Sequence, residues 1–209
     1  MRNKHAFGGL LLFSASTVMI IYFSLLYNGN ALSQITPAVW SILLWLTILF
    51  SAVNAVASSF FREREENLMY YHFLFSPTVF ITAKIIYNIF FSLILTVVSG
   101  LIFMLMISNP VQNSLLFFEI MLLGAISYSI LFTLMSAIAL KARSDNTLVA
   151  VLGFPILIPM LIFITKTTSA ALGAVEMMEL ANKNLLLLLA LNGVQLVLAG
   201  ILFPYIWKE

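Results

Sequence analysis

The chain has no cysteine, and charged residues make up only 9% of its 209 residues. Without cysteine it cannot form a disulfide framework, a cysteine-ligated metal site or a covalent haem attachment site of the CxxCH type. A formal net charge of +2 provides no basic patch for nucleic acid. Histidine occurs only at His5 and His72, and no zinc-binding or catalytic-nucleophile motif is present. We therefore expect no enzyme activity, no metal site and no cofactor bound by this chain.

Hydrophobic residues are abundant instead. They make up 62% of the sequence, and the mean hydropathy is +1.08, whereas soluble domains are about 45–50% apolar. This composition predicts an all-α membrane protein with one transmembrane domain over residues 1–209. A membrane-spanning helix needs about 20 apolar residues, and this length predicts six spans. They cover approximately residues 6–27, 39–59, 78–106, 115–140, 148–165 and 185–207.

The positions of lysine and arginine predict the orientation, because cytoplasmic loops are enriched in both. Only Lys166 and Lys183 fall on one side of the predicted spans. The opposite side has Arg2, Lys4, Arg62, Arg64, Lys84, Lys141, Arg143 and Lys208. Both termini and residues 60–84 are therefore expected in the cytoplasm. The first apolar run, of about 22 residues, is longer than the apolar core of a signal peptide, so we expect it to be retained.

Residues 60–77 interrupt the apolar sequence most strongly. Each charged side chain here would cost about 2.5–3.5 kcal/mol at the centre of a bilayer, so the segment must lie in water or against a partner. The charged residues directly after Phe61 are Arg62, Glu63, Arg64, Glu65 and Glu66. Leu68, Tyr71 and Phe75 then recur at helical spacing before Pro77 begins the next run. A solvated turn would explain the charges but not this aromatic stripe, and we interpret residues 60–77 as a docking element.

Two later segments have unusual features. Gly153, Pro155 and Pro159 predict a kinked or broken fifth span that lies inside the bundle. The kink is either a gating hinge or a packing feature. Residues 166–184 are too polar to span a membrane and predict an amphipathic helix at the outer interface. That helix could be a cap over an exit path, a platform for a partner or a plain linker.

Few polar residues fall inside the predicted spans. Glu119 is a functional candidate because it is ionisable, but it lies close enough to a span end for its carboxylate to reach the outer interface. Asn192 and Gln195 share one face of the sixth span, and we expect interhelical hydrogen bonds from them rather than a substrate site. Aromatic residues near span ends, including Trp40 and Tyr205, are interpreted as interfacial anchors.

Several stretches resemble one known family. A charged RERE segment followed by an aromatic helix, Ser76-Pro77 and Lys84 is similar to the connection between the second and third spans of ABC-2 permeases. More specifically, the chain resembles CcmB, the haem exporter B permease of cytochrome c maturation. The stretches that carry this resemblance are PAVW at 37–40, ILFSAVNAVASSFFRERE at 48–65, NPVQ at 109–112, SAIALKARSDNTLVAVLGFPILIPMLIF at 136–163 and LFPY at 202–205. The run KARSDNTLVAVLGFPILIPML within the fourth stretch is the most specific.

The resemblance implies a permease subunit in the bacterial inner membrane whose residues 60–77 couple to a cytoplasmic ATPase. ATP would be bound by that partner, because the chain has no phosphate-binding loop. Haem would be the cargo of the complex, with haem-handling membrane subunits and a periplasmic haem chaperone as partners and two copies of this chain together. ATP hydrolysis would drive haem export or release of the haem-loaded chaperone.

Three points stay open on the sequence alone. An ABC-2 exporter of another substrate, such as a lipid or a drug, has the same general pattern. The same pattern also fits a membrane scaffold that transmits motion within the haem-handling complex without transporting anything. Members of the resembled family usually have an amphipathic cytoplasmic helix before the first span, where this chain has only Met1 to His5. Two explanations fit that difference: the start of the sequence is assigned too late, or this protein lacks the helix.

Overall fold

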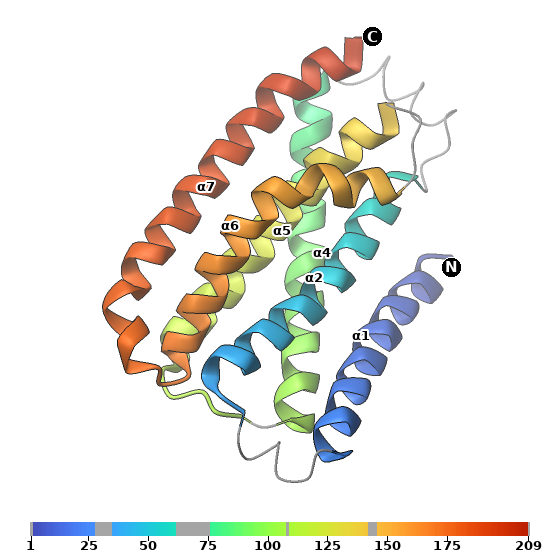
Figure 1. The fold of residues 1–209 in the computed structure, drawn as a ribbon. Helices are drawn as coiled ribbons and strands as arrows, with labels where there is room; N and C mark the ends of the chain where they lie inside the picture. Colours follow the sequence, from blue (N-terminus) through green and yellow to red (C-terminus); the bar gives the residue numbers. More distant parts are fainter. Residues whose placement is uncertain (1, 28–34, 62–75, 108, 142–145, 209) are drawn as a thin grey trace.

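The computed structural model describes residues 2–27, 35–61, 76–107, 109–141 and 146–208 of the chain. All the regular secondary structure of these residues is helical. The helices are α1 (Arg2–Tyr27), α2 (Pro37–Phe61), α4 (Pro77–Met106), α5 (Ser114–Lys141), α6 (Asn146–Ala171) and α7 (Val175–Lys208) (Figure 1). Five of them, all except α1, contain a stretch long and apolar enough to cross a membrane. The predicted all-α membrane class is confirmed.

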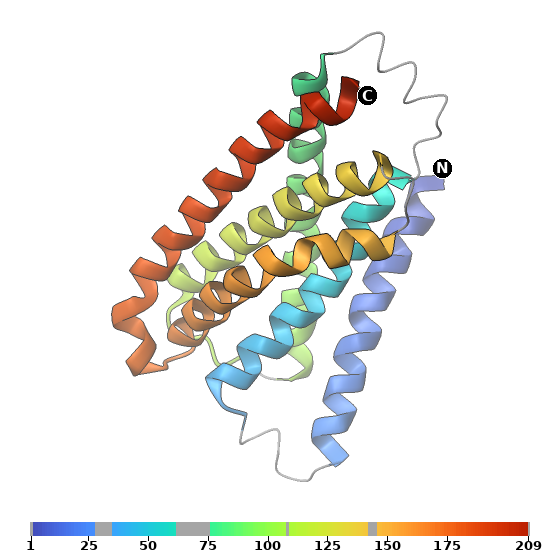
Figure 2. The ribbon, with the colours of Figure 1, turned by 45° about the horizontal axis from the view of Figure 1, so that its top comes forward.

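Successive helices run in opposite directions through the bundle (Figures 1 and 2). The start of α1, the end of α2, the start of α4 and the end of α7 therefore lie towards one end of the bundle. The ends of α1, α4 and α6 lie towards the other. The long apolar runs determine this arrangement, because a helix satisfies its own backbone hydrogen bonds in lipid and only short connections are needed between antiparallel neighbours.

Helix α5 forms the centre of the bundle. It packs against α2, α4, α6 and α7, and every side chain from Ser127 to Ala137 is buried. Larger neighbours complete the core, since Trp40, Trp45 and Phe103 have almost no exposed surface. By contrast, α4 and α7 expose long apolar faces, as lipid-facing helices do.

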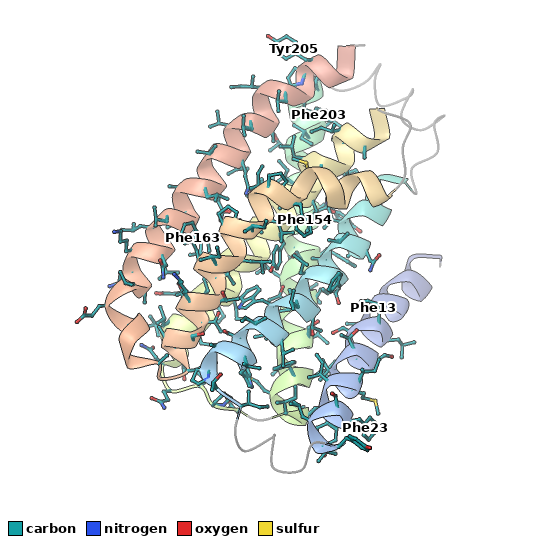
Figure 3. The ribbon with its side chains drawn as sticks, viewed as in Figure 1. Phe13, Phe23, Phe154, Phe163, Phe203 and Tyr205 are labelled. Carbon is teal, nitrogen blue, oxygen red and sulfur yellow. The ribbon has the colours of Figure 1, made fainter. Side chains whose placement is uncertain are left out.

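Helix α1 lies at the edge of the bundle, where it packs mainly against α2 and α4. Its described apolar part, Leu11–Tyr27, is shorter than those of the other helices. The hydroxyl groups of Ser14 and Ser99 form a hydrogen bond of 2.7 Å between α1 and α4. Phe13 and Phe23 are exposed on this helix (Figure 3). Polar contact with α4 and an apolar outer face are what a peripheral membrane helix requires.

The structure differs from the sequence expectation at residues 166–184, which do not form a helix of their own. Helix α6 continues to Ala171, and α7 begins at Val175. The hydroxyls of Thr167, Thr168 and Ser169 donate to the carbonyl oxygens four residues earlier. These polar residues therefore continue a buried helix, because their hydroxyls are satisfied within it.

Trp40 is also placed differently from the expectation. It was predicted to anchor the chain at the membrane interface, but only 1% of its surface is exposed. Its ring packs edge-to-face against Phe103 of α4, with centroids 5.0 Å apart, and against Phe117 of α5 at 6.2 Å. A tryptophan near the end of a span lies in the interface only when no neighbouring helix covers it. Tyr205, in contrast, is exposed as expected of an anchor (Figure 3).

Candidate functional site

The predicted docking element lies mostly outside the described residues. Phe61 is the last residue of α2, and Pro77 is the first of α4. The structure therefore shows the two helices that the element joins. The predicted residues outside the description are Arg62, Glu63, Arg64, Glu65, Glu66, Leu68, Tyr71 and Phe75.

The start of α4 is well defined. Ser76 has extended backbone angles (φ −69°, ψ 149°) and Pro77 occupies the first helical turn, where its missing N–H costs nothing. The amide N–H of Phe80 donates to the carbonyl oxygen of Ser76 at 3.1 Å. The Phe80 ring stacks on Phe203 of α7, with centroids 5.9 Å apart and planes 12° apart. Displacement of residues before Pro77 would therefore act on both α4 and α7.

Helix α2 ends at the predicted docking element, and its first half is hydrogen-bonded to the second half of α6. The indole N–H of Trp45 donates to the hydroxyl oxygen of Thr168 at 2.7 Å. One turn earlier, the hydroxyls of Ser41 and Ser169 form a hydrogen bond of 2.8 Å. All four side chains are buried. Hydrogen bonds in an apolar interior hold two helices in one register, because water does not compete for the groups.

Trp45 also contacts the central helix. A Cβ atom added at Gly124 of α5 would lie 2.6 Å from Cζ3 of Trp45, so the indole fits only because residue 124 has no side chain. The hydroxyl of Tyr128, one turn further along α5, donates to the Trp45 carbonyl oxygen at 3.4 Å. Trp45 therefore joins α2, α5 and α6 at one point.

Helices α4 and α5 have their own polar contacts. The side-chain amide of Asn88 donates to the hydroxyl oxygen of Thr133 at 2.9 Å, and both residues are buried. The hydroxyl of Ser92 donates to the carbonyl oxygen of Ala125 at 3.1 Å. The two helices that receive the ends of the docking element, α2 and α4, are therefore both hydrogen-bonded to the bundle interior.

A turn at the far end connects α4–α5 with α6–α7. The backbone N–H groups of Gln112 and Asn113 both donate to the carbonyl oxygen of Ala171, each at 3.0 Å. Gly173 has φ +92° and ends α6 in a Schellman motif. In this motif the N–H of Gly173 donates to the carbonyl oxygen of Ala170, and the N–H of Ala174 donates to that of Ser169. The connection before α5 thus satisfies a carbonyl that the end of α6 leaves free.

Replacing Gly173 with alanine tests this turn. We expect a loss of about 1–2 kcal/mol from the left-handed backbone alone, and a further loss because the new Cβ would overlap the side chain of Gln112. Thermal unfolding of the purified protein, followed by circular dichroism, measures the combined effect. Adding Gln112→Ala should recover the overlap part but not the backbone part. Equal stability of Gly173→Ala and the unmodified protein would contradict this account of the turn.

The hinge candidates lie in the first half of α6. The helix remains continuous through Pro155 and Pro159, and it changes direction along its length in both views (Figures 1 and 2). Gly153 is buried, whereas Pro155 is exposed and Pro159 is half-buried. Only one face of α6 is therefore inside the bundle, because Phe154 and Ile158 are exposed beside the prolines. Whether the bend serves gating remains a prediction.

The three intramembrane polar candidates are not brought together as one site. Glu119 is exposed in the second turn of α5. Asn192 and Gln195 are 96% and 98% buried on the inner face of α7. Neither amide has a hydrogen-bond partner among the described residues, so the expected interhelical hydrogen bonds from them are not seen. A shared helix face determines burial, but it does not determine whether the neighbouring helix presents a polar group at that level.

Sequence reasoning missed the residues that connect the helices. No sequence motif surrounds Trp45, Gly124 or Thr168. They lie on three different helices and meet only in the folded structure. No group of three or more histidine, aspartate or glutamate residues that could hold a metal occurs within the described part of the chain. The signal that could have identified Gly124 is a glycine inside an apolar helix, since such a residue usually marks close packing.

Comparison with known proteins identifies the family. The family model described as CcmB protein matches residues 1–205, which is nearly the whole chain. No curated protein and no solved structure matches the chain. The match confirms the resemblance seen in the PAVW, NPVQ and KARSDNTLVAVLGFPILIPML stretches. The chain belongs to the CcmB family.

Proposed function

We propose that this protein is the permease subunit that couples ATP hydrolysis by a partner to haem export or to release of a haem-loaded periplasmic chaperone. Membership of the CcmB family over residues 1–205 is the observation that carries the proposal. The family implies a component of the haem-exporting ABC transporter of cytochrome c maturation. The coupling step, its direction and its partners are the proposed part.

The partners follow from what the chain lacks and where it turns. It has no phosphate-binding loop, so a cytoplasmic ATPase subunit supplies ATP hydrolysis. Two copies of this chain present two docking elements to two ATPase subunits. Haem-handling membrane subunits and the periplasmic haem chaperone complete the complex in the inner membrane. Both termini and residues 60–77 face the cytoplasm, since lysine and arginine are concentrated at that end.

The contacts of α2 and α4 suggest how motion is transmitted. Movement of the docking element displaces the end of α2 and the start of α4. Through Trp45 and Ser41, α2 moves the second half of α6. Through Phe80 and Asn88, α4 moves α7 and α5. The Ala171–Gly173 turn then links these displacements at the outer end. Packed helices transmit displacement because the interior cannot be compressed.

Charge reversal of the docking element tests the proposal. In the variant, Arg62 and Arg64 become glutamate while Glu63, Glu65 and Glu66 become arginine. We expect the protein to insert normally, but co-purification of the ATPase and the amount of c-type cytochromes should both fall at least tenfold, because like charges now face the partner. Co-purification and haem staining measure these effects.

A matched control reverses two exposed charges at the other end, with Glu179→Lys and Lys183→Glu. It should leave both measurements unchanged. Intact ATPase association and cytochrome assembly in the docking-element variant would overturn the proposal. A deletion strain that retains all c-type cytochromes would favour an exporter of a different substrate. Absence of haem flux in vesicles with a functional complex would favour a non-transporting scaffold.

A further inference from the structure

A groove of about 640 Å³ opens between the start of α2 and the end of α6. It lies at the end of the bundle opposite both termini (Figure 1). Its volume is in the range of small-molecule sites. The lining residues used below are Thr36, Ser41, Ile42, Ile162, Thr165, Lys166 and Ser169.

The described lining of the groove is positively charged at a single residue. Among its described lining residues, Lys166 is the only charged one, and none is acidic. Three of its hydroxyls are already used within the protein, since Ser41 and Ser169 bond each other and Thr165 donates to the carbonyl of Leu161. The hydroxyl oxygen of Thr36 accepts from the backbone N–H of Val39 at 3.4 Å. The ammonium group of Lys166 is therefore the main polar feature that a ligand would meet. The first turn of α2, at the rim, adds a weak preference for negative charge.

An apolar strip continues from the groove along α6. Ile162 and Ile42 are each nearly half exposed on its two sides. Ile158 and Phe154 precede Ile162 in the sequence at four-residue intervals, and both are exposed. Phe154 is labelled in Figure 3. The strip from Ile162 to Phe154 is about 12 Å long at 1.5 Å per residue. A cation at one end of an apolar strip matches an anionic head with a hydrocarbon tail.

We propose that this groove binds an anionic phospholipid, with the phosphate at Lys166 and an acyl chain along Ile162, Ile158 and Phe154. Phosphatidylglycerol fits better than phosphatidylethanolamine, because no described lining residue is acidic and an ethanolamine ammonium would have no counter-charge. Haem is also an anionic amphiphile, but no histidine, methionine or tyrosine lies among the described lining residues to ligate its iron. The site is independent of the proposed coupling function.

Lipid titration of the purified complex tests the site. Phosphatidylglycerol is added to delipidated complex and the bound lipid is counted by native mass spectrometry, with phosphatidylethanolamine for comparison. Lys166→Gln should weaken phosphatidylglycerol binding about tenfold, the effect of losing one charge-assisted contact. Lys166→Arg should retain it, and Lys183→Gln, which removes an exposed charge on α7, should have no effect. Equal binding by Lys166→Gln and the unmodified complex would overturn the proposal, as would equal loss in Lys183→Gln.

A second variant distinguishes the other possible occupants. The chain has no cysteine, so Ile162→Cys introduces a single reactive thiol at the groove. We expect it to react with a lipid-soluble maleimide in membranes and to form no disulfide between two copies. Efficient disulfide formation would show that a second copy covers the groove and would overturn the proposal. Haem binding that is lost in Lys166→Gln would assign the groove to haem instead and would also overturn it.

Discussion

Replacing Gly124 with leucine is expected to destabilise the protein by about 3 kcal/mol or more, at the upper end of the cost of overpacking a core. A Cβ at this position already meets the indole of Trp45. Trp45 is fully buried and hydrogen-bonded to Thr168, so the ring cannot move aside without breaking that bond. Helices α2 and α5 would have to separate, and the α2–α6 contact would weaken with them.

Thermal unfolding in detergent and the yield of folded protein measure the effect. Gly124→Ala should show a smaller loss in the same direction. Gly193→Ala and Gly200→Ala are matched controls within one membrane helix, because nothing lies within 4 Å of a Cβ added at either position. They should be neutral or slightly stabilising, since alanine is favoured over glycine in a helix by about 1 kcal/mol. A Gly124→Leu protein as stable as these controls would contradict the close packing.

Trp45→Ala has the second large expected effect, a loss of about 3–5 kcal/mol, as for other buried tryptophans. The substitution leaves a cavity between α2, α5 and α6 and removes the edge-to-face contact with Tyr128, whose ring centroid is 5.8 Å away. It also removes the hydrogen bond to Thr168. Since α2 ends at the docking element, we expect cytochrome c assembly to fail even in the fraction that folds.

Trp45→Phe weakens packing less than Trp45→Ala does, because it retains a six-membered ring and removes the pyrrole part of the indole together with its N–H. We expect it to cost about 1–2 kcal/mol, the range found for hydrogen bonds between membrane helices. A double-mutant cycle with Thr168→Val should give a coupling energy of at least 0.6 kcal/mol. Additive effects of the two substitutions would show that the bond does not hold α2 and α6 together.

These residues change where the candidate functional site is placed. The sequence focuses attention on the charged segment after Phe61, which we predict to be a contact surface for a partner. The structure adds the contacts through which, in the proposed function, movement of that segment would reach the rest of the bundle. Trp45 connects α2 to α6, and Asn88 connects α4 to α5. Each of the two helices that flank the predicted docking element is therefore joined to another helix of the bundle by a buried hydrogen bond.

The sequence by itself determined the fold class, the positions of most helices and the family. Apolar runs of 20 or more residues have few alternatives to a membrane helix, and Ser76-Pro77 marks the start of α4 because proline is favoured in the first turn. Local patterns were sufficient for these predictions. Polarity alone failed at residues 166–184, because the hydroxyls of Thr167, Thr168 and Ser169 are satisfied within α6.

Only the tertiary structure decided which polar residues have partners and which aromatic residues are buried. Trp40 is enclosed by Phe103 and Phe117 although it lies near a helix end, and Asn88 has a partner whereas Asn192 and Gln195 have none among the described residues. The physical reason is that the helical spacing of apolar residues predicts only the helix face on which a residue lies. What that face meets depends on the register and crossing of neighbouring helices, which long-range packing sets.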